Sequence, residues 1–259
     1  MEECESAWMN ECEGWLALGN VSRSIYHIEK QDGLICAWWV YPFETHNHCI
    51  LVPPGTASQD VLVGLAGLRE RLESSKCAAE IRIVSKTGIA GELLVGLQRS
   101  GFAYSGSDPI MTCPIRNLKP PSPSEAVIHK AVTRDRYIEV LETFDSVFGG
   151  PRYLTHFFNP EEVIQFYYAS LNGKLVSAAA VWSFSGVKGF YSVSTLRPYR
   201  GRGYASQLIR HVLYENAAGD TLAALRTTDK LVPFYEKLGF QETGRMYRFI
   251  RQKRKKRFW

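Results

Sequence analysis

Three prolines in four residues, at positions 120, 121 and 123, divide the sequence near its middle. Proline has no backbone N–H and disfavours a helical conformation in the residue before it, so this run interrupts both helices and central strands. We therefore predict a linker at residues 119–123, one domain at 1–118 and a second at 124–259. Each piece has the size of an ordinary small domain.

The composition is typical of a chain that buries a hydrophobic core. Hydrophobic residues make up 45% of the 259 residues and charged residues 22%, which excludes disordered and fibrous classes. No stretch approaches the roughly 18 apolar residues that a membrane span needs. The acidic start, Met1–Glu5, does not resemble a signal peptide. We expect a cytoplasmic protein with no membrane span.

The cysteines do not indicate a metal site or a disulfide framework. All six lie in the first half, and none forms a Cys-x-x-Cys pair, so we expect reduced and mostly buried thiols. His46, His48 and Cys49 could combine in a zinc site. Zinc ligands usually come as spaced pairs, however, and we predict no bound metal.

Positive charge is concentrated at the C-terminal end. The net charge is +5, yet residues 245–259 hold eight Lys or Arg and no acid, so the remainder carries a net charge of −3. Such a basic segment can contact nucleic acid, an anionic membrane or an acidic partner. A solvated, frayed terminus is the more common case and is our default interpretation.

The second half predicts a mixed α/β layer, in which three antiparallel strands lead into a strand–helix–strand unit. Thr133 is a good N-cap for a helix that Gly149-Gly150 end, and Asn159–Glu162 indicate another helix start. Asn172-Gly173 fit a tight hairpin turn. The expected strands are 126–132, 164–171, 175–184, 190–196, 221–226 and 240–251, with a turn at 186–189 and helices at 203–217 and 229–238.

The most informative segment lies between the strand at 190–196 and the helix at 203–217, and reads Arg200-Gly201-Arg202-Gly203-Tyr204-Ala205-Ser206. Glycines let a backbone approach a ligand closely. Free amides at a helix start favour phosphate or pyrophosphate, and the two arginines add charge. The alternative is a tight turn with no ligand. The Walker and dinucleotide-binding glycine patterns are both absent.

Arg200-x-x-Gly203-x-Ala205 resembles the Arg/Gln-x-x-Gly-x-Gly/Ala motif of GCN5-related N-acetyltransferases (GNATs), and Asp229–Phe240 is similar to their second signature. The resemblance covers the second half. It implies a GNAT fold of the α/β (α+β) class, with a mixed central sheet flanked by helices, and acetyl-CoA as cofactor. The implied cofactor-binding residues are Val193, Ser194 and Thr195 on the strand, Arg200, Gly201, Arg202, Gly203, Tyr204, Ala205 and Ser206 in the loop, and Thr228.

The resemblance also implies that Tyr235 is catalytic, because a tyrosine at this place in the family protonates the departing CoA thiolate. A phenol with a pKa of about 10 can donate that proton. Simple packing beside Phe234 and Phe240 is the alternative. Thr228 replaces an asparagine common in the family, and Pro198 stands one place later than usual.

No general base is assigned, because the strand at 190–196 contains no acid. Glu161, Glu162 and His156 lie where the family often builds its acceptor site, and a water chain would serve equally well. The same segment carries aromatic and cationic residues that would suit an aromatic or acidic amine. These are Arg152, Tyr153, His156, Phe157 and Phe158.

The first half lacks the loop motif. The loop motif is absent from residues 53–59, which follow the strand at 49–52. Leu97 takes the place that Tyr235 has in the second half. Both halves end in a short helix, a glycine stop and a strand, at Glu92–Phe102 and Lys230–Phe240, which supports a duplication hypothesis. We therefore expect a smaller, non-catalytic, degenerate GNAT-like domain, as in tandem members with one inactive half. An unrelated α/β domain is the alternative.

Together these features predict an acetyl-CoA-dependent N-acetyltransferase, in which a small-molecule or peptide amine attacks the thioester directly. One alternative is a non-catalytic acyl-CoA-binding or sensor module. Another is an acetyltransferase that reaches a nucleic-acid-associated target through the basic tail. The sequence predicts no oligomeric state.

Overall fold

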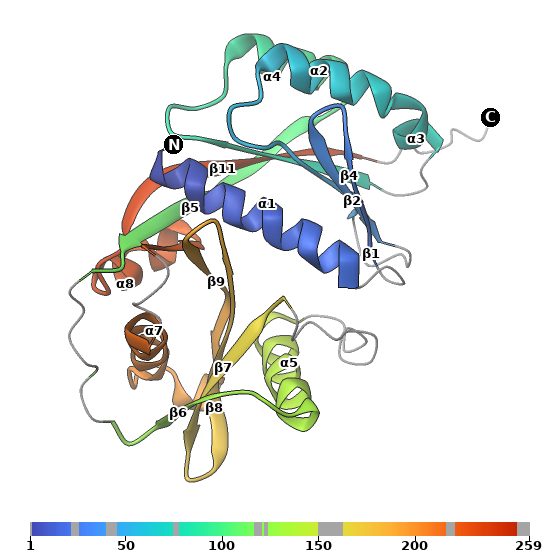
Figure 1. Cartoon of the computed structure of the whole chain (residues 1–259). Helices are drawn as coiled ribbons and strands as arrows, with labels where there is room; N and C mark the ends of the chain where they lie inside the picture. The colour runs from blue at the N-terminus through green and yellow to red at the C-terminus, as the bar shows by residue number, and fades with distance from the viewer. Residues whose placement is uncertain are drawn as a thin grey trace. The chain divides into compact units, whose positions relative to one another are not determined.

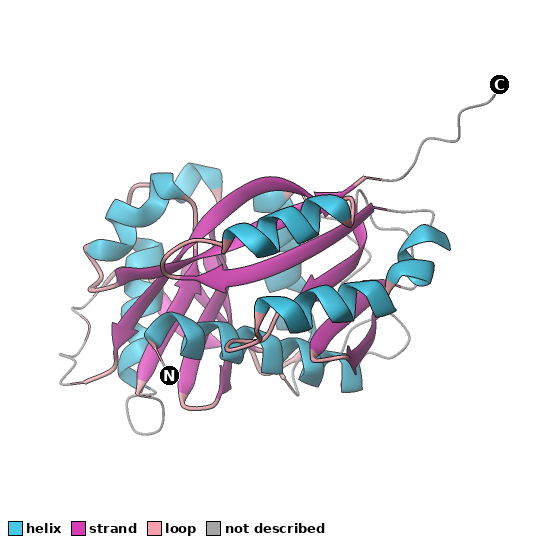
Figure 2. Cartoon of the chain, turned by 90° about the horizontal axis from the view of Figure 1, so that it is seen from above, coloured by secondary structure: helices cyan, strands magenta, loops and turns pink. Residues whose placement is uncertain are grey.

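The structure is a computed structural model that describes residues 2–21, 26–39, 46–74, 78–116, 121, 124–149, 163–215 and 221–252. Its chain forms two compact units. The first comprises Met1–Ile110 and Thr243–Trp259, and the second comprises Met111–Glu242. Both are mixed α/β structures (Figure 2), which confirms the expected fold class. No helix in the described ranges is long and apolar enough to cross a membrane.

In the first unit, helices cover both faces of a sheet with strand order β1-β2-β3-β4-β11-β5 (Figure 1). Strands β1, β2 and β3 form an antiparallel meander, β3 and β4 are parallel, and β11 is antiparallel to β4. The elements are α1 (Glu3–Val21), β1 (Tyr26–Gln31), β2 (Leu34–Trp39), β3 (His46–Leu51), α2 (Ser58–Gly67), α3 (Arg69–Ser74), β4 (Ala78–Ser85), α4 (Gly91–Arg99), β5 (Ala103–Pro114) and β11 (Gln241–Arg251).

The second unit has the strand order β5-β10-β9-β8-β7-β6, with α5 on one face of the sheet and α7 on the other (Figure 1). Strands β6 to β9 are antiparallel, and β10 is parallel to β9. The elements are β6 (Val127–Lys130), α5 (Arg134–Phe148), β7 (Gln165–Leu171), β8 (Lys174–Phe184), β9 (Val187–Thr195), the 3-10 turn η2 (Arg197–Tyr199), α7 (Tyr204–Glu215), β10 (Leu222–Arg226), the 3-10 turn η3 (Asp229–Leu231) and α8 (Val232–Glu236).

The predicted helix start, helix end and hairpin turn in the second half are confirmed. The Thr133 hydroxyl accepts a hydrogen bond from the Arg136 amide at the start of α5. Gly149 ends α5 with φ of 71°. Asn172 and Gly173 form the β7–β8 turn with φ of 51° and 77°.

Two element predictions are wrong in detail. The second hairpin turn is formed by Ser185 and Gly186, with φ of 50° and 73°, instead of residues 186–189, so Gly189 lies inside β9. The expected helix at 229–238 is a 3-10 turn followed by α8. Pro233 has no amide hydrogen, so it cannot donate the i→i−4 bond that would join them. The helix start expected at 159–162 lies outside the described residues.

Strands β5 and β11 each contain residues of both units, so the units differ from the division expected at the proline-rich segment. Met111 and Cys113 on β5 belong to the core of the second unit, although they precede that segment. Phe249 on β11 belongs to the core of the first unit. Each half of the sequence therefore supplies a strand segment to the other unit.

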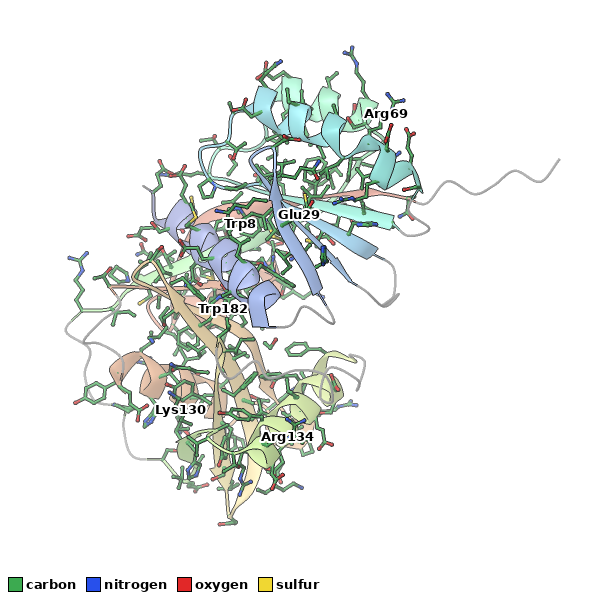
Figure 3. The ribbon with its side chains drawn as sticks, turned by 45° about the vertical axis from the view of Figure 1, so that its right-hand side comes forward. Trp8, Glu29, Arg69, Lys130, Arg134 and Trp182 are labelled. Carbon is green, nitrogen blue, oxygen red and sulfur yellow. The ribbon has the colours of Figure 1, made fainter. Side chains whose placement is uncertain are left out.

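The first unit contains a buried ionic group on β4. Arg82 donates to the Glu80 carboxylate at 2.8 Å and lies 3.7 Å from the Glu11 carboxylate on α1. Trp8 on α1 (Figure 3) is 1% exposed, and its indole N–H donates to the Val52 carbonyl at 2.6 Å. Trp8 is therefore a core anchor that fixes α1 against the end of β3.

The cysteines in the described part of the chain are buried and form no disulfide: Cys4, Cys12, Cys36, Cys49 and Cys113. Burial is the main cause that raises the pKa of the Cys12 thiol, and it raises the pKa of the Cys36 thiol to about 12. Within the same residues, no group of three or more His, Cys, Asp or Glu side chains could hold a metal ion.

Candidate functional site

The parallel ladder between β9 and β10 is shorter than β9 itself. The paired residues run from Val187 with Leu222 to Phe190 with Leu225. Strand β9 continues to Thr195, whereas β10 ends at Arg226. Beyond Phe190, the backbone groups of β9 that point away from β8 are therefore not hydrogen-bonded within the β9–β10 ladder.

Backbone alternation shows which groups face that opening. The Leu196 amide donates to the Val176 carbonyl at the start of β8. Successive residues of a strand direct their amide and carbonyl groups to opposite sides. The backbone of Ser194 therefore faces β8, as does that of Leu196, whereas Val193 and Thr195 direct theirs toward the opening.

Ser194 is held by β8 through a further contact. Its carbonyl accepts a hydrogen bond from the Ser177 hydroxyl at 2.6 Å, and its side chain is buried. The Thr195 carbonyl accepts from Arg200 Nε at 3.0 Å. Of the three residues predicted to bind the cofactor on this strand, Val193 and Thr195 direct their backbone groups toward the opening. Ser194 directs its backbone toward β8 and holds the strand in place there.

A β-bulge lies at the start of the opening, and sequence reasoning missed it. Ala178 pairs with Ser194 and Ala180 with Tyr191, so β9 has one more residue than β8 over this interval. Ser192 occupies the bulge with φ of 51° and an exposed side chain. A non-glycine residue at positive φ is uncommon and tends to occur at functional sites. Serine gives no local signal for this conformation.

An aromatic pair lies beside the bulge. The rings of Trp182 on β8 (Figure 3) and Tyr191 on β9 have centroids 4.2 Å apart. The indole nitrogen of Trp182 is buried and has no hydrogen-bond partner among the described residues. Sequence reasoning did not single out either residue, since aromatic side chains on strands are common in cores.

The glycine turn leads directly into helix α7. Gly201 and Gly203 have φ of 78° and 83°, a region that favours glycine. A Cβ built at either position would meet no protein atom within 4 Å. The missing side chains therefore leave open space in front of the turn, where a ligand could lie close to the backbone.

The start of α7 offers free amides beside this space. The Gln207 amide donates to the Gly203 carbonyl at 3.0 Å, which makes this the first helical bond of α7. The preceding amides, at Tyr204, Ala205 and Ser206, have no acceptor within the helix. A helix start of this kind suits an anion, so the residues present fit a pyrophosphate group.

The loop arginines have different surroundings. Arg200 and Arg202 are both exposed, and neither forms an ion pair in the described part of the chain. Arg200 ties the loop to the end of β9 through Thr195. The Arg202 guanidinium lies 6.0 Å from the centre of the Tyr199 ring. Their charge is therefore available to an anion in the turn.

Tyr235 lies on α8 and is 6% exposed. Its ring packs edge-on against Phe234 and Phe240, with centroids 4.9 and 6.0 Å away. Burial raises the pKa of the Tyr235 phenol to about 12. No hydrogen bond to its hydroxyl is found among the residues described. The phenol is thus kept in its protonated form by apolar surroundings.

The fold brings two predicted residues to one hydrophobic cluster. Tyr235 is a member of this cluster, and Val193 packs against it. Thr228 is different: its side chain is exposed, and its carbonyl accepts from the Leu231 amide at the start of η3. The predicted acceptor-site residues lie outside the described ranges: Arg152, Tyr153, His156, Phe157, Phe158, Glu161 and Glu162.

Comparison with known protein families identifies part of the second unit. Residues 162–242 match the family model described as an acetyltransferase (GNAT) domain. This range contains β7 to β10, the glycine turn, α7 and α8. Among curated proteins, none matches this sequence.

Solved structures extend the similarity to both units. A GCN5-related N-acetyltransferase from Kribbella flavida has a TM-score of 0.74 and 14% identity, covering 97% of this chain and 96% of its own. A putative acetyltransferase from the GNAT family of Novosphingobium aromaticivorans has a TM-score of 0.56 and 20% identity, covering 93% of this chain and 96% of its own. A tandem GNAT protein from the clavulanic acid biosynthesis pathway has a TM-score of 0.60 and 14% identity, covering 85% and 78%. At these identities the similarity establishes the fold.

Proposed function

We propose that the chain, whose residues 162–242 match the acetyltransferase (GNAT) domain model, transfers an acetyl group from acetyl-CoA to a primary amine. The single observation that supports this most is the opening beside β9 with the amide-rich start of α7 following it. A strand edge and a helix start in succession suit an extended ligand that has amide groups at one end and a diphosphate at the other.

The second unit would hold this ligand with backbone groups. Val193 and Thr195 would bond the pantetheine arm, and the amides of residues 203–206 would bond the pyrophosphate with help from Arg200 and Arg202. The role of Thr228 in the proposal is a hydroxyl contact to the pantetheine arm, since it follows β10 in the loop before η3. Bound acetyl-CoA supplies an activated acyl group as a thioester.

The Tyr235 phenol would act as the proton donor. Amine attack on a thioester forms a C–N bond and breaks the C–S bond, so the departing sulfur needs a proton. Because its pKa is raised to about 12, Tyr235 retains its proton at neutral pH. The hydroxyl carries no competing hydrogen bond among described residues. The amine loses its own proton to a base in the acceptor site or to water.

The Trp182–Tyr191 pair supports an acceptor that carries an aromatic or hydrogen-bond-accepting group beside its amine. The pair lies next to the bulge at Ser192, and the indole N–H of Trp182 has no partner among the described residues. A ring on the acceptor could stack there, and an oxygen could accept from the indole.

Thiol release from acetyl-CoA, measured over a panel of amines, tests the proposal. We expect release that depends on the amine and a matching acetylated product by mass spectrometry. Calorimetry with coenzyme A is run in parallel. Saturable binding without turnover on any amine would instead indicate an acyl-CoA-binding or sensor module, and absence of binding would refute both.

A further inference from the structure

The second unit contains a cavity of about 360 Å³ whose lining does not include the glycine turn. Its walls are formed by α5, the β7–β8 hairpin and the residue that follows β9. Helix α5 covers one face of the sheet, whereas α7, which begins at the glycine turn, covers the other (Figure 1). The volume is at the small end of the range for ligand pockets, which suits a small metabolite. The polar side chains that line the cavity are Arg136, Glu139, Glu142, Thr143, Ser146 and Lys174.

Two of the charged side chains neutralise each other. Arg136 donates to the Glu139 carboxylate at 2.6 Å. The Arg136 guanidinium also lies 5.7 Å from the centre of the Tyr168 ring, which stacks on His129 with centroids 4.9 Å apart. Arg136 is thus held in place by a carboxylate and an aromatic ring, and the pair adds no net charge to the cavity.

The other two charged side chains, Glu142 and Lys174, are open to a ligand. Both are exposed, and neither forms an ion pair with a described residue, including the other. Lys174 Nζ lies 5.8 Å from the centre of the Tyr199 ring. Glu142 comes from α5 and Lys174 from the start of β8. Two elements of the same cavity therefore offer a carboxylate and an ammonium group, and each can attract a ligand charge of opposite sign.

The hydroxyl groups of the lining favour a hydrogen-bond donor on the ligand. The Thr143 hydroxyl donates to the Glu139 carbonyl at 2.9 Å, and the Ser146 hydroxyl donates to the Thr143 carbonyl at 3.0 Å. A hydroxyl whose proton is used in this way has only lone pairs left to offer. Together with Glu142, α5 therefore presents acceptors that suit an ammonium group, while Lys174 suits a carboxylate.

We propose that this cavity is a binding site for a small zwitterion of the α-amino acid type, with its ammonium group on Glu142 and its carboxylate on Lys174. Arg136, fixed by Glu139, lines the same cavity and is a second donor for the carboxylate. A molecule with only one of the two charges would leave one of these side chains without a partner. The assignment is independent of the acetyltransferase proposal, because it uses neither the opening beside β9 nor Tyr235.

Calorimetry on the intact chain tests the proposal with a panel of the common L-amino acids, titrated to about 10 mM. Two analogues of the tightest binder follow, one without the carboxylate and one without the ammonium group. We expect saturable heat for at least one amino acid and at least ~10-fold weaker binding of both analogues, because each loses a charge-assisted hydrogen bond. An analogue that binds as tightly as the amino acid would refute the zwitterion assignment, as would absence of heat from the whole panel.

Matched substitutions locate the site. Glu142→Gln and Lys174→Met should each weaken amino-acid binding at least ~10-fold. The controls are Glu215→Gln on α7 and Lys130→Met on β6 (Figure 3), which remove the same charges outside the cavity. They should leave the affinity within about twofold of the parent. Unchanged affinity in Glu142→Gln and Lys174→Met would place the amino acid elsewhere and overturn the assignment.

Coenzyme A separates this proposal from the proposed acetyltransferase function. We expect the same amino-acid affinity, within about twofold, with and without saturating coenzyme A. Competition between the two would place the amino acid in the opening beside β9 and refute a second site. Amino-acid binding that depends on Glu142 and Lys174, in a chain that does not bind coenzyme A, would support the zwitterion site and refute only the acetyltransferase.

Discussion

Each unit contains one pair of parallel strands, β3 with β4 and β9 with β10, and the two pairs differ in how far their hydrogen-bonded ladders extend. In the first unit, β3 and β4 remain paired to the end of β3, through Leu51 with Arg82, and the Val52 amide extends the ladder to the Arg82 carbonyl at 3.1 Å. In the second unit, the β9–β10 ladder ends at Phe190, well before Thr195. In the first unit β3 thus stays paired to its end, whereas in the second unit part of β9 lies beyond its ladder with β10.

The turns after these strands differ in charge. In the first unit, a cavity of about 520 Å³ lies beside the turn, and its lining includes Asp32, Thr56 and Asp60. Asp60 lies in the first turn of α2. Its negative charge is therefore already at the positive end of the helix dipole, where an anionic ligand would bind. In the second unit the corresponding turn carries Arg200 and Arg202. Charge therefore opposes a diphosphate in one unit and favours it in the other.

The ionic group on β4 joins this strand to α1. Arg82 is held by Glu80 on its own strand and by Glu11 on α1. Moving α1 away from β4 would leave a buried charge without one of its partners, which is costly.

The largest effect is expected from Tyr235→Phe. Losing the phenolic proton donor should slow amine-dependent thiol release by roughly 100- to 10,000-fold, with coenzyme A affinity within about twofold of the parent. Stopped-flow thiol detection and calorimetry measure the two quantities. Tyr247→Phe, on β11 in the first unit, is the control and should leave both unchanged. Undiminished turnover in Tyr235→Phe would remove Tyr235 from the mechanism.

A matched pair of glycine substitutions tests whether only the turn before α7, and not the turn before α2, binds the diphosphate. Gly203 and Gly55 both have positive φ, 83° and 76°, and open space around a built Cβ. Valine at either position strains the backbone by a similar amount, yet only Gly203→Val fills the proposed phosphate site. We expect coenzyme A affinity to fall about 100-fold in Gly203→Val and to stay within about twofold in Gly55→Val. Equal losses in calorimetry would contradict the difference between the turns.

A smaller effect is expected at the bulge. Ser192 and Asp32 share a left-handed backbone, with φ of 51° and 48°. Valine at either position should cost about 1–3 kcal/mol of stability in urea unfolding. Only Ser192→Val should also reduce turnover, by about tenfold, because it alters the strand edge beside the proposed thioester site. Full activity in a folded Ser192→Val protein would show that the bulge has no role in turnover.

The smallest effect concerns stability at high pH. The pKa of Tyr235 is about 12 in the folded protein and about 10 in an unfolded chain, so the native state retains a proton that the unfolded state loses. Stability should therefore decrease as pH rises from 10 toward 12, by at most about 1.4 kcal/mol per pH unit from this group. Urea unfolding at pH 9, 10 and 11 should show a shallower decrease in Tyr235→Phe. Identical slopes would indicate that the phenol is not buried in solution.

The parts of the fold that could be predicted from sequence are those fixed by neighbouring residues. Thr133, Gly149 and the Asn172-Gly173 turn each determine their own backbone, and the GNAT fold follows from two motifs with distinct patterns. Gly189 was misleading, because a glycine within a strand and a glycine in a turn look alike without the pairing partner.

The exchanged strands and the bulge could not be predicted, for two physical reasons. The strand expected after Phe102 is present as β5, but no local feature of the sequence indicates which sheet edge accepts it, because that depends on pairing with residues far along the chain. Ser192 takes a glycine-like conformation because the surrounding ladder imposes it. For the candidate site, the motif residues can be named from the sequence, whereas the opening beside β9 is a property of strand pairing.

The reciprocal strands have a consequence for the order in which the chain can fold during synthesis. Strand β4 must wait for residues 245–251 before it gains its second neighbour, although α1 to β4 leave the ribosome much earlier. Until then, the early part of the chain exposes an unsatisfied edge to other nascent proteins. The first unit is therefore completed only after β11 has been synthesised, whereas the second unit consists of residues 111–242.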